Sequence, residues 1–149
     1  MNIMEQNNLN KGQKIDELPE NYTVIDIETT GLSPIVNEII QLSALKIRND
    51  KIVDSFTSFV KPSGRISSFI SSLTGITNDM VANAPQINDV LNDYIDFIGN
   101  DIIVGHNVHF DINFIHSKRI KYFNQGLSNN YVDTCRMSRK ICPINSHKL

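Results

Sequence analysis

Two acidic residues, Asp26 and Glu28, are separated by one position within a run of β-branched and aromatic residues that begins at Tyr22. Successive side chains of a strand point to opposite faces, so both carboxylates project from one face, and Ile25 and Ile27 project from the other. Two neighbouring carboxylates repel each other unless a positive charge lies between them. An edge strand with one wet face would also give this pattern. The turn sequence that follows directly places the acids near a strand end, where ligands commonly bind.

A third acid, Asp111, stands in a segment with helical periodicity. It lies three or four residues from Val108, Phe114 and Ile115, which places its carboxylate on a mostly apolar helix face. Burial of an unpaired charge is costly, so this carboxylate needs a partner. A Lys or Arg from elsewhere in the fold would serve. The alternative is that Asp111 faces the first two acids across a divalent cation.

Carboxylate ligands of this kind favour Mg²⁺ or Mn²⁺ over zinc. Two such ions can activate a water molecule, hold a phosphate and stabilise the leaving oxygen of a hydrolytic cut. The three acids therefore predict phosphodiester hydrolysis. A zinc site built from Cys135, Cys142 and His147 is a weaker alternative, because their spacing matches no standard ligand pattern. We interpret the two cysteines as reduced structural thiols.

The acids must be positioned by a small number of regular elements. Three strands are predicted at residues 22–28, 38–47 and 51–60, with Asn49-Asp50 as a hairpin turn between the second and third. A short helix is expected over residues 67–73, and a longer amphipathic helix over 87–98, ended by Gly99.

The second half of the chain alternates between strands and helices. The predicted order is a buried strand at 101–105, a helix at 108–120, a short strand at 131–133 and a helix through Arg139. Antiparallel strands followed by this alternation indicate an α/β fold, in which helices flank a mixed sheet whose later strands are parallel.

Length and composition fit one domain. The chain has 149 residues, 40% of them hydrophobic, and its apolar runs are far shorter than the roughly 18 residues of a membrane span. Residues 1–20 are polar, with no apolar core typical of a secretory signal, so we expect a flexible tail there and a domain over residues 21–149. These features favour a cytoplasmic protein without a membrane partner.

Charge is distributed unevenly along the chain, although the net charge is only -2. Residues 75–111 contain six acids and no Lys or Arg, whereas residues 117–149 contain seven bases and one acid. A basic C-terminal third is suited to lie along a phosphate backbone. A solvated helix face is the commoner explanation of such a run, and both interpretations stay open here.

Three segments resemble the DEDD exonuclease superfamily, and most closely its histidine branch, which includes the proofreading subunit of bacterial DNA polymerase III and the exonuclease domain of the Gram-positive polymerase. The segments are Asp26-Ile27-Glu28-Thr29-Thr30-Gly31-Leu32, Leu73-Thr74-Gly75-Ile76-Thr77, and Gly105-His106-Asn107 with Phe110, Asp111 and Phe114. They occur in the family's order and approximate spacing, and the likeness runs from about Tyr22 to Leu149. One such segment would be weak support, but three together are specific.

The resemblance implies a ribonuclease H-like fold and a two-metal Mg²⁺ or Mn²⁺ site held by Asp26, Glu28 and Asp111, which are also the implied catalytic residues. It implies 3'-5' exonuclease activity on DNA, of the proofreading or repair type, with a preferably single-stranded 3' end as substrate and a replicative polymerase as a partner. The implied substrate contacts are Thr29, Thr30, Gly31, Leu32, Leu73, Thr74, Gly75, His106, Asn107 and Phe114. For Asn107, helix capping is an equally good interpretation. Asp133 stands where the family often has an Asp-Thr pair and is interpreted as structural.

One part of the family pattern is missing. The third motif, a general-base His followed five residues later by a fourth carboxylate, normally lies beyond the position of Asn145–Leu149. We therefore expect this form to lack that motif and to have weak or no activity, since general-base help is worth about 10²–10⁴-fold. A remnant that binds nucleic acid or a polymerase without cutting is the alternative function. RNA trimming would use the same motifs, and contacts to the 2'-hydroxyl cannot be predicted from these residues.

Overall fold

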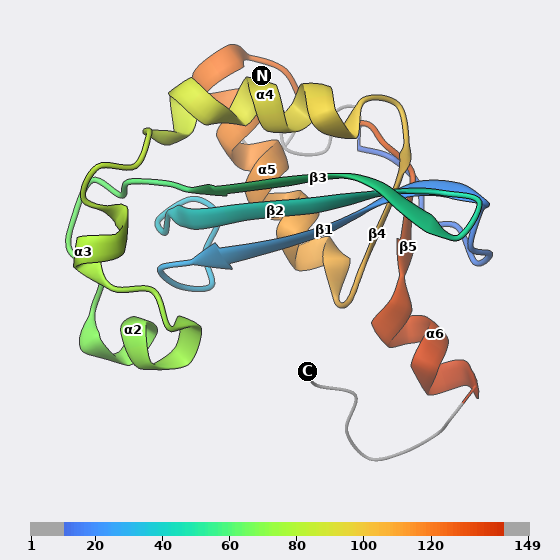
Figure 1. Cartoon of the computed structure of the whole chain (residues 1–149), viewed down its shortest axis with the longest axis horizontal. Helices are drawn as coiled ribbons and strands as arrows, with labels where there is room; N and C mark the ends of the chain where they lie inside the picture. Colours follow the sequence, from blue (N-terminus) through green and yellow to red (C-terminus); the bar gives the residue numbers. More distant parts are fainter. Residues whose placement is uncertain (1–10, 142–149) are drawn as a thin grey trace.

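The computed structural model describes residues 11–141, which form one five-stranded sheet with helices on its faces (Figure 1). The strands are β1 (Asn21–Thr29), β2 (Ile39–Arg48), β3 (Lys51–Phe59), β4 (Ile102–Gly105) and β5 (Tyr131–Asp133). The helices are α2 (Ser68–Thr74), α3 (Asn78–Val81), α4 (Ile87–Ile98), α5 (Val108–Phe123) and α6 (Thr134–Ile141). Sequence periodicity predicted every one of these elements except α3, which is a single turn.

The strand order is β3-β2-β1-β4-β5. The first three strands are antiparallel, and β4 and β5 join parallel to β1 and to each other. This confirms the predicted mixed sheet. Asn49 and Asp50 connect β2 to β3 with φ angles of 49° and 61°. Positive φ at both positions matches the twist of a two-residue hairpin and is tolerated best by Asn, Asp and Gly.

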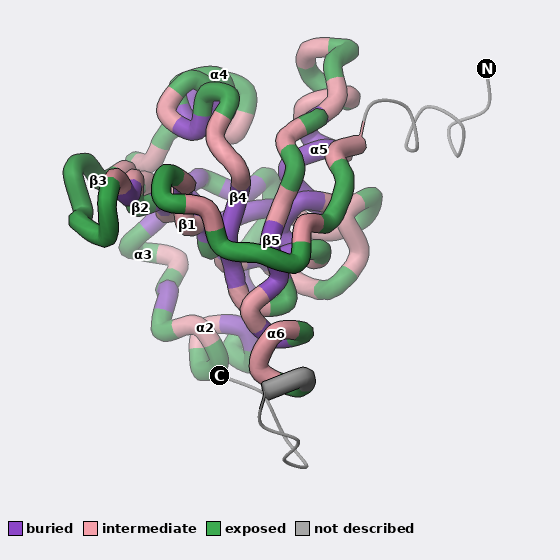
Figure 2. The backbone as a smooth tube through the Cα atoms, turned by 90° about the vertical axis from the view of Figure 1, so that its right-hand side faces the viewer, coloured by how far each residue is buried: buried purple, intermediate pink, exposed green. Residues whose placement is uncertain are grey.

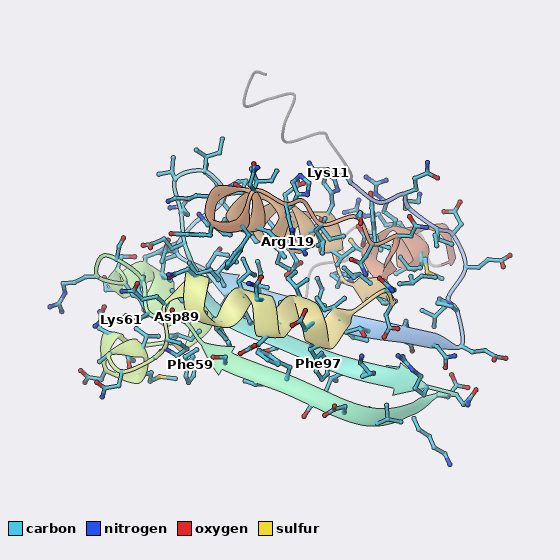
Figure 3. The ribbon with its side chains drawn as sticks, turned by 90° about the horizontal axis from the view of Figure 1, so that it is seen from above. Lys11, Phe59, Lys61, Asp89, Phe97 and Arg119 are labelled. Atoms are coloured by element: carbon cyan, nitrogen blue, oxygen red, sulfur yellow. The ribbon has the colours of Figure 1, made fainter. Side chains whose placement is uncertain are left out.

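The main hydrophobic core lies between one face of the sheet and the helices α4 and α5. Leu91 and Tyr94 of α4 and Phe114 of α5 have essentially no exposed surface and pack against Ile25 and the other inward residues of the sheet. Figure 3 shows α4 lying over the strands on this face, with its axis roughly along their direction. The helices α2, α3 and α6 lie on the other side of the sheet, near its two ends (Figure 1). Between them part of this second face stays open.

The segment before β1 packs on the domain. The amide of Ile15 donates to the carbonyl of Tyr131 at 2.7 Å, and the amide of Tyr131 donates to the carbonyl of Gln13 at 3.0 Å. Residues 11–20 of the expected flexible tail therefore run beside β5 and belong to the domain. The first ten residues lie outside the described part, as do Cys142 and His147 of the alternative zinc site; Cys135 is buried. Across residues 11–141 every helix is too short or too polar to cross a bilayer.

Asp101, just before β4, forms hydrogen bonds with residues of β1 and β2 at the end of the sheet where β1 begins. Its carboxylate accepts hydrogen bonds from Thr23 Oγ1 at 2.7 Å and from an Arg48 guanidinium nitrogen at 2.9 Å. The group is partly accessible, so its contribution is reduced by solvent screening. We expect Asp101→Ala to lower the free energy of unfolding by about 1–2 kcal/mol. Urea unfolding in metal-free buffer measures this, and an unchanged midpoint would show that the ion pair contributes nothing.

Candidate metal and nucleic-acid site

The carboxylates of Asp26 and Glu28 lie on the open face of β1. Ile25 and Ile27 are 3% and 6% exposed on the opposite face, within or against the core. The alternation predicted for this strand is therefore present. Opposite the two acids on β2 stand Ser43 and Gln41, so the neighbouring positions of the open face are neutral and polar.

A cleft of about 610 Å³ covers this part of the sheet. Its volume is within the usual range for small-molecule sites. The β1 acids lie in it together with residues from the N-terminal segment, β4 and the start of α6. The lining residues are Leu18, Tyr22, Val24, Ile25, Asp26, Glu28, Val104, Gly105, His106 and Thr134.

The Asp111 side chain can reach β1 because β4, the neighbouring strand, ends before it would pair with Ile27. The last pair between β1 and β4 is Val24 with Val104, so the amide of Ile27 lies beyond the end of the neighbouring strand. The Asp111 carboxylate takes this place and accepts the hydrogen bond of the Ile27 amide at 2.9 Å. Asp111 is 5% exposed, as its apolar helix face predicted. The acid of the second motif is thus held against the strand that carries the two acids of the first motif.

The three acids disfavour one another's ionisation. Burial raises the pKa of Asp111 to about 8, with a further increase from the charge of Asp26, while the Ile27 amide opposes the shift. The pKa of Asp26 is raised by desolvation within the cleft, although its side chain is still accessible. Desolvation and then the charge of Asp26 raise the pKa of Glu28. A bound cation would offset the mutual repulsion of these carboxylates and would favour their ionised forms.

The donor set fits Mg²⁺ or Mn²⁺, because all three side chains offer carboxylate oxygens. In the described part of the chain none of the three takes part in an ion pair. Within the same residues no three His, Cys, Asp or Glu side chains converge into a group that could hold a metal ion. The acids are therefore close enough for their charges to interact, but they do not form a closed ligand set. Mutual repulsion of like charges is a sufficient physical reason for this spacing.

The turn that leads from β4 into α5 is held by residues at the end of β5. The buried Asp133 carboxylate accepts hydrogen bonds from the backbone amides of Asn107 at 2.9 Å and Cys135 at 3.0 Å. Thr134 Oγ1 donates to the Gly105 carbonyl at 3.2 Å and lies 3.3 Å from Nδ1 of His106. Asp133 has the structural role predicted for it.

Asn107 itself does not cap α5 through its side chain. It has a left-handed conformation with φ 53°, and its side chain makes no capping hydrogen bond. The capping interpretation was therefore wrong. Asn107 is exposed, and His106 beside it lines the cleft.

The other predicted substrate residues lie in two loops. Leu32 is 84% exposed in the loop after β1, and Leu73 is 71% exposed at the end of α2. The Thr30 hydroxyl accepts from the Glu38 amide at 2.9 Å and closes the first loop. Gly75 ends α2 with φ 75°, a conformation that a side chain would strain.

Two predicted substrate residues need correction. Phe114 has 0% of its surface exposed and packs against Phe110 with ring centroids 4.9 Å apart, so it is a core residue. The side chain of Thr29 is 9% exposed and its hydroxyl donates to the Gly31 carbonyl at 2.7 Å, which makes it a support of the turn. Both stand in motifs of which other members, such as Asp26 and His106, line the cleft, and only the three-dimensional fold separates them.

Leu18 and Thr134 line the cleft but were not among the predicted site residues. Thr134 follows Asp133 at a strand-to-helix junction, a position that could have been inferred. Leu18 had no comparable signal, because it stands in a stretch that looked like a tail. In the basic C-terminal third, Lys118 and Arg119 donate to backbone carbonyls within the domain, so two of its seven bases have internal roles.

The sequence profile of the family described as "Exonuclease" matches residues 23–146. "DNA polymerase III PolC-type" of Caldanaerobacter subterraneus subsp. tengcongensis is 45% identical over 130 residues, which are 87% of this chain and 9% of the relative. The protein of the same name from Bacillus subtilis is 39% identical over 132 residues, again 87% and 9%. The chain therefore spans only about a tenth of the length of these relatives.

Solved exonuclease structures share the fold. "Exonuclease X in complex with 5' overhanging duplex DNA" superimposes with a TM-score of 0.68 at 26% identity, over 85% of this chain and 68% of that one. The nuclease domain of "3'hExo, a DEDDh family member, bound to rAMP" gives 0.70 at 22% identity, over 87% and 74%. The mixed sheet and its flanking helices are thus the ribonuclease H-like arrangement of these nucleases (Figure 2 shows its buried central strands).

Proposed function

The chain belongs to the Exonuclease family, and from this membership we propose that it is a metal-dependent exonuclease that removes nucleotides from the 3' ends of DNA. The observation that supports the proposal is that the Asp111 carboxylate accepts the Ile27 amide, which lies between Asp26 and Glu28 in β1, while those two strand acids line a cleft. The three acids come from two separate motifs, and Asp111 is buried without an ion pair within the described residues.

Asp26 and Glu28 would hold the metal ions from the strand, and Asp111 from the helix. When bound, the ions supply charge stabilisation at the scissile phosphate and activation of the attacking water. The Ile27 amide orients the Asp111 carboxylate by donating to its Oδ1. Asp133 and Thr134 hold the turn that carries His106 and Asn107 toward the cleft.

The loops after β1 and after α2 would hold the terminal nucleotide. Their exposed leucines, Leu32 and Leu73, offer apolar contact to a base of any sequence. Thr30, Gly31, Thr74 and Gly75 shape the two loops, and their backbone groups lie beside those leucines in sequence. Such contacts are independent of base identity, as removal of successive nucleotides requires.

The polymerase relatives support a role in proofreading and a polymerase as partner. These relatives also support a cytoplasmic localisation. A DNA substrate is supported by two solved neighbours, Exonuclease X with a 5' overhanging duplex and E. coli Exonuclease I with a dA16 oligonucleotide. We propose an unpaired 3' end as the preferred substrate, because the exposed Leu32 and Leu73 would offer apolar contact to single bases.

The proposal is tested with a single-stranded DNA labelled at its 5' end and incubated with the purified chain and Mn²⁺. In keeping with the weak activity expected for this form, we expect a slowly formed ladder of products that shorten one nucleotide at a time and that EDTA abolishes. Asp96→Asn, which removes an exposed acid of α4 outside the cleft, is the matched control and should give the same ladder. A folded chain that binds Mn²⁺ and leaves the DNA intact would refute cleavage by this form.

Binding without cleavage is the second candidate. It is favoured by one observation, that the acids of residues 11–141 do not form a closed set of three metal ligands. In that case the chain should retain a labelled oligonucleotide in an anisotropy titration under conditions in which no product forms. An RNA oligonucleotide of the same sequence, used in the same titration, would show whether the chain binds DNA or RNA more tightly.

A further inference from the structure

We propose that Lys118 is a positioning residue for the substrate loop, and that its ammonium group fixes the Thr30–Glu38 loop to α5. The loop follows the strand that carries the β1 acids, and its exposed Leu32 is the side chain that would contact the terminal nucleotide. The role in substrate binding rests on the proposed function, whereas the role in fixing the loop does not.

Lys118 is a buried lysine. Only 5% of its surface is exposed, and its Nζ donates to the carbonyl of Asn37 at 2.7 Å and to the carbonyl of Pro34 at 3.0 Å. Its neighbour Ser117 donates to the same Pro34 carbonyl at 3.3 Å. An ammonium group loses strong hydration when it is buried, so it is kept at such a position only where it meets good acceptors. Here the acceptors are two carbonyls of one loop.

The loop has its own internal hydrogen bonds but little apolar contact with the domain. The Thr30 amide donates to the Glu38 carbonyl at 2.8 Å at its base, and the Asn37 amide donates to the Ser33 carbonyl at 2.8 Å further out. Its aliphatic side chains point outward, since Leu32, Ile35 and Val36 are 84%, 69% and 78% exposed. Segments with few buried apolar contacts open easily. The polar contacts from α5 must therefore supply much of what holds this loop.

The same stripe of α5 serves the acids and the loop. Lys118 lies seven residues after Asp111, which is close to two helical turns, so both side chains leave the helix in nearly the same direction. Asp111 reaches the Ile27 amide of β1, and Lys118 reaches the loop that β1 leads into. One rigid helix thereby sets the position of Leu32 relative to the buried acid.

Desolvation lowers the pKa of Lys118, with a further decrease from Lys121, and Glu38 opposes the shift. A cavity of about 140 Å³ adjoins the side chain and is lined by Glu38, Lys61 and Tyr122 among others. This space leaves room for the larger head group of an arginine. Arginine keeps the charge and can donate to two acceptors at once, which makes Lys118→Arg a conservative variant.

The experiment compares Lys118→Met, Lys118→Arg and Lys121→Met in the full chain. Lys121→Met removes the same charge from an exposed position one turn away. Hydrogen exchange of the backbone amides of the loop reports its fixation without any ligand. Anisotropy with a single-stranded oligonucleotide in the presence of Ca²⁺, and Mn²⁺ titration, report substrate and metal binding separately.

We expect Lys118→Met to raise the exchange of the loop amides at least about tenfold and to weaken oligonucleotide binding by a similar factor, while Mn²⁺ affinity stays unchanged. Lys118→Arg should keep loop exchange and oligonucleotide binding close to those of the unmodified chain. Lys121→Met should change neither quantity. Unaltered loop exchange in Lys118→Met would overturn the proposal. A loosened loop with unaltered oligonucleotide binding would keep the fixation but refute the substrate role of the loop. Global unfolding of Lys118→Met would appear as faster exchange throughout the sheet. In that case the Lys118→Arg chain is the test, and native loop exchange in it would support the contacts between a cationic donor and the loop carbonyls.

Discussion

Replacing Asp111 by asparagine is expected to make the metal-free chain more stable at pH 8, by about 1–3 kcal/mol, while removing its stabilisation by Mn²⁺. Asparagine has the shape of the protonated acid, and its side-chain oxygen can still accept the Ile27 amide. What the substitution removes is a buried negative charge that lies near two other acids. An acid that is retained at a cost to stability is characteristic of a functional site.

The dependence on pH follows from the raised pKa of Asp111. Folding shifts this pKa from 3.8 to about 8, so the folded chain keeps a proton that the unfolded chain has lost. Stability from this group is fully present below about pH 4, declines as the pH rises, and is lost above about pH 8. The loss is on the order of 5 kcal/mol at most. The advantage of the Asp111→Asn chain should therefore be near zero at pH 4 and should grow until pH 8.

Urea unfolding of both chains at several pH values, with and without Mn²⁺, measures these effects. Asp101→Ala is the control, because it removes an acid with an ion partner and should destabilise the chain. Mn²⁺ should raise the stability of the unmodified chain, since a cation offsets the buried charge. An Asp111→Asn chain that is less stable than the unmodified one at pH 8 would show that the carboxylate is not the destabilising group.

Asp26→Asn is expected to weaken Mn²⁺ binding at least about tenfold and to slow release of 3'-terminal nucleotides by about 10³-fold. Asp26 acts on both other acids, because its charge raises the pKa values of Glu28 and Asp111. It is therefore central to the electrostatics of the site. A factor of 10³ corresponds to about 4 kcal/mol of lost charge stabilisation, a reasonable share for one ligand of a metal-assisted hydrolysis.

Mn²⁺ affinity is followed by electron paramagnetic resonance of the free ion, and the rate by the gel assay with labelled DNA. The first readout does not depend on activity, so it separates loss of the metal from loss of cleavage. Asp96→Asn again serves as the control for removal of an acid. Native Mn²⁺ affinity in Asp26→Asn would remove this residue from the metal site.

Most of the fold could be predicted from the sequence, because the longer elements have a clear period. The alternation around Asp26 predicted which face of β1 is wet, and the apolar spacing from Ile87 to Ile98 predicted α4 with its exact bounds. The single turn of α3 has too few residues to show a period. The packing of residues 11–20 beside β5 depends on backbone hydrogen bonds, which leave no pattern in side-chain types.

The wet face of β1 and the burial of Asp111 could be predicted from the sequence, whereas the contacts that support these acids could not. The Asp111 carboxylate was located from the apolar face of its helix, but its hydrogen bond to Ile27 depends on where β4 ends. Phe114 and Thr29 stand in matching motifs and yet point into the core or the turn, since neither motif fixes which side chains face the cleft. Lys118 looked like part of a basic surface, and only its contacts with the loop carbonyls show its role.

The Ile27 amide gives the molecule an intrinsic probe of its acidic site. This single N–H lies between the two β1 acids in sequence and donates to the third, so its electronic environment changes whenever Asp111 gains or loses a proton. In a ¹⁵N-labelled chain it corresponds to one nuclear magnetic resonance peak in the backbone of a central strand. Protonation and cation binding can thus be followed at one atom pair without introducing a label or a substitution into the cleft.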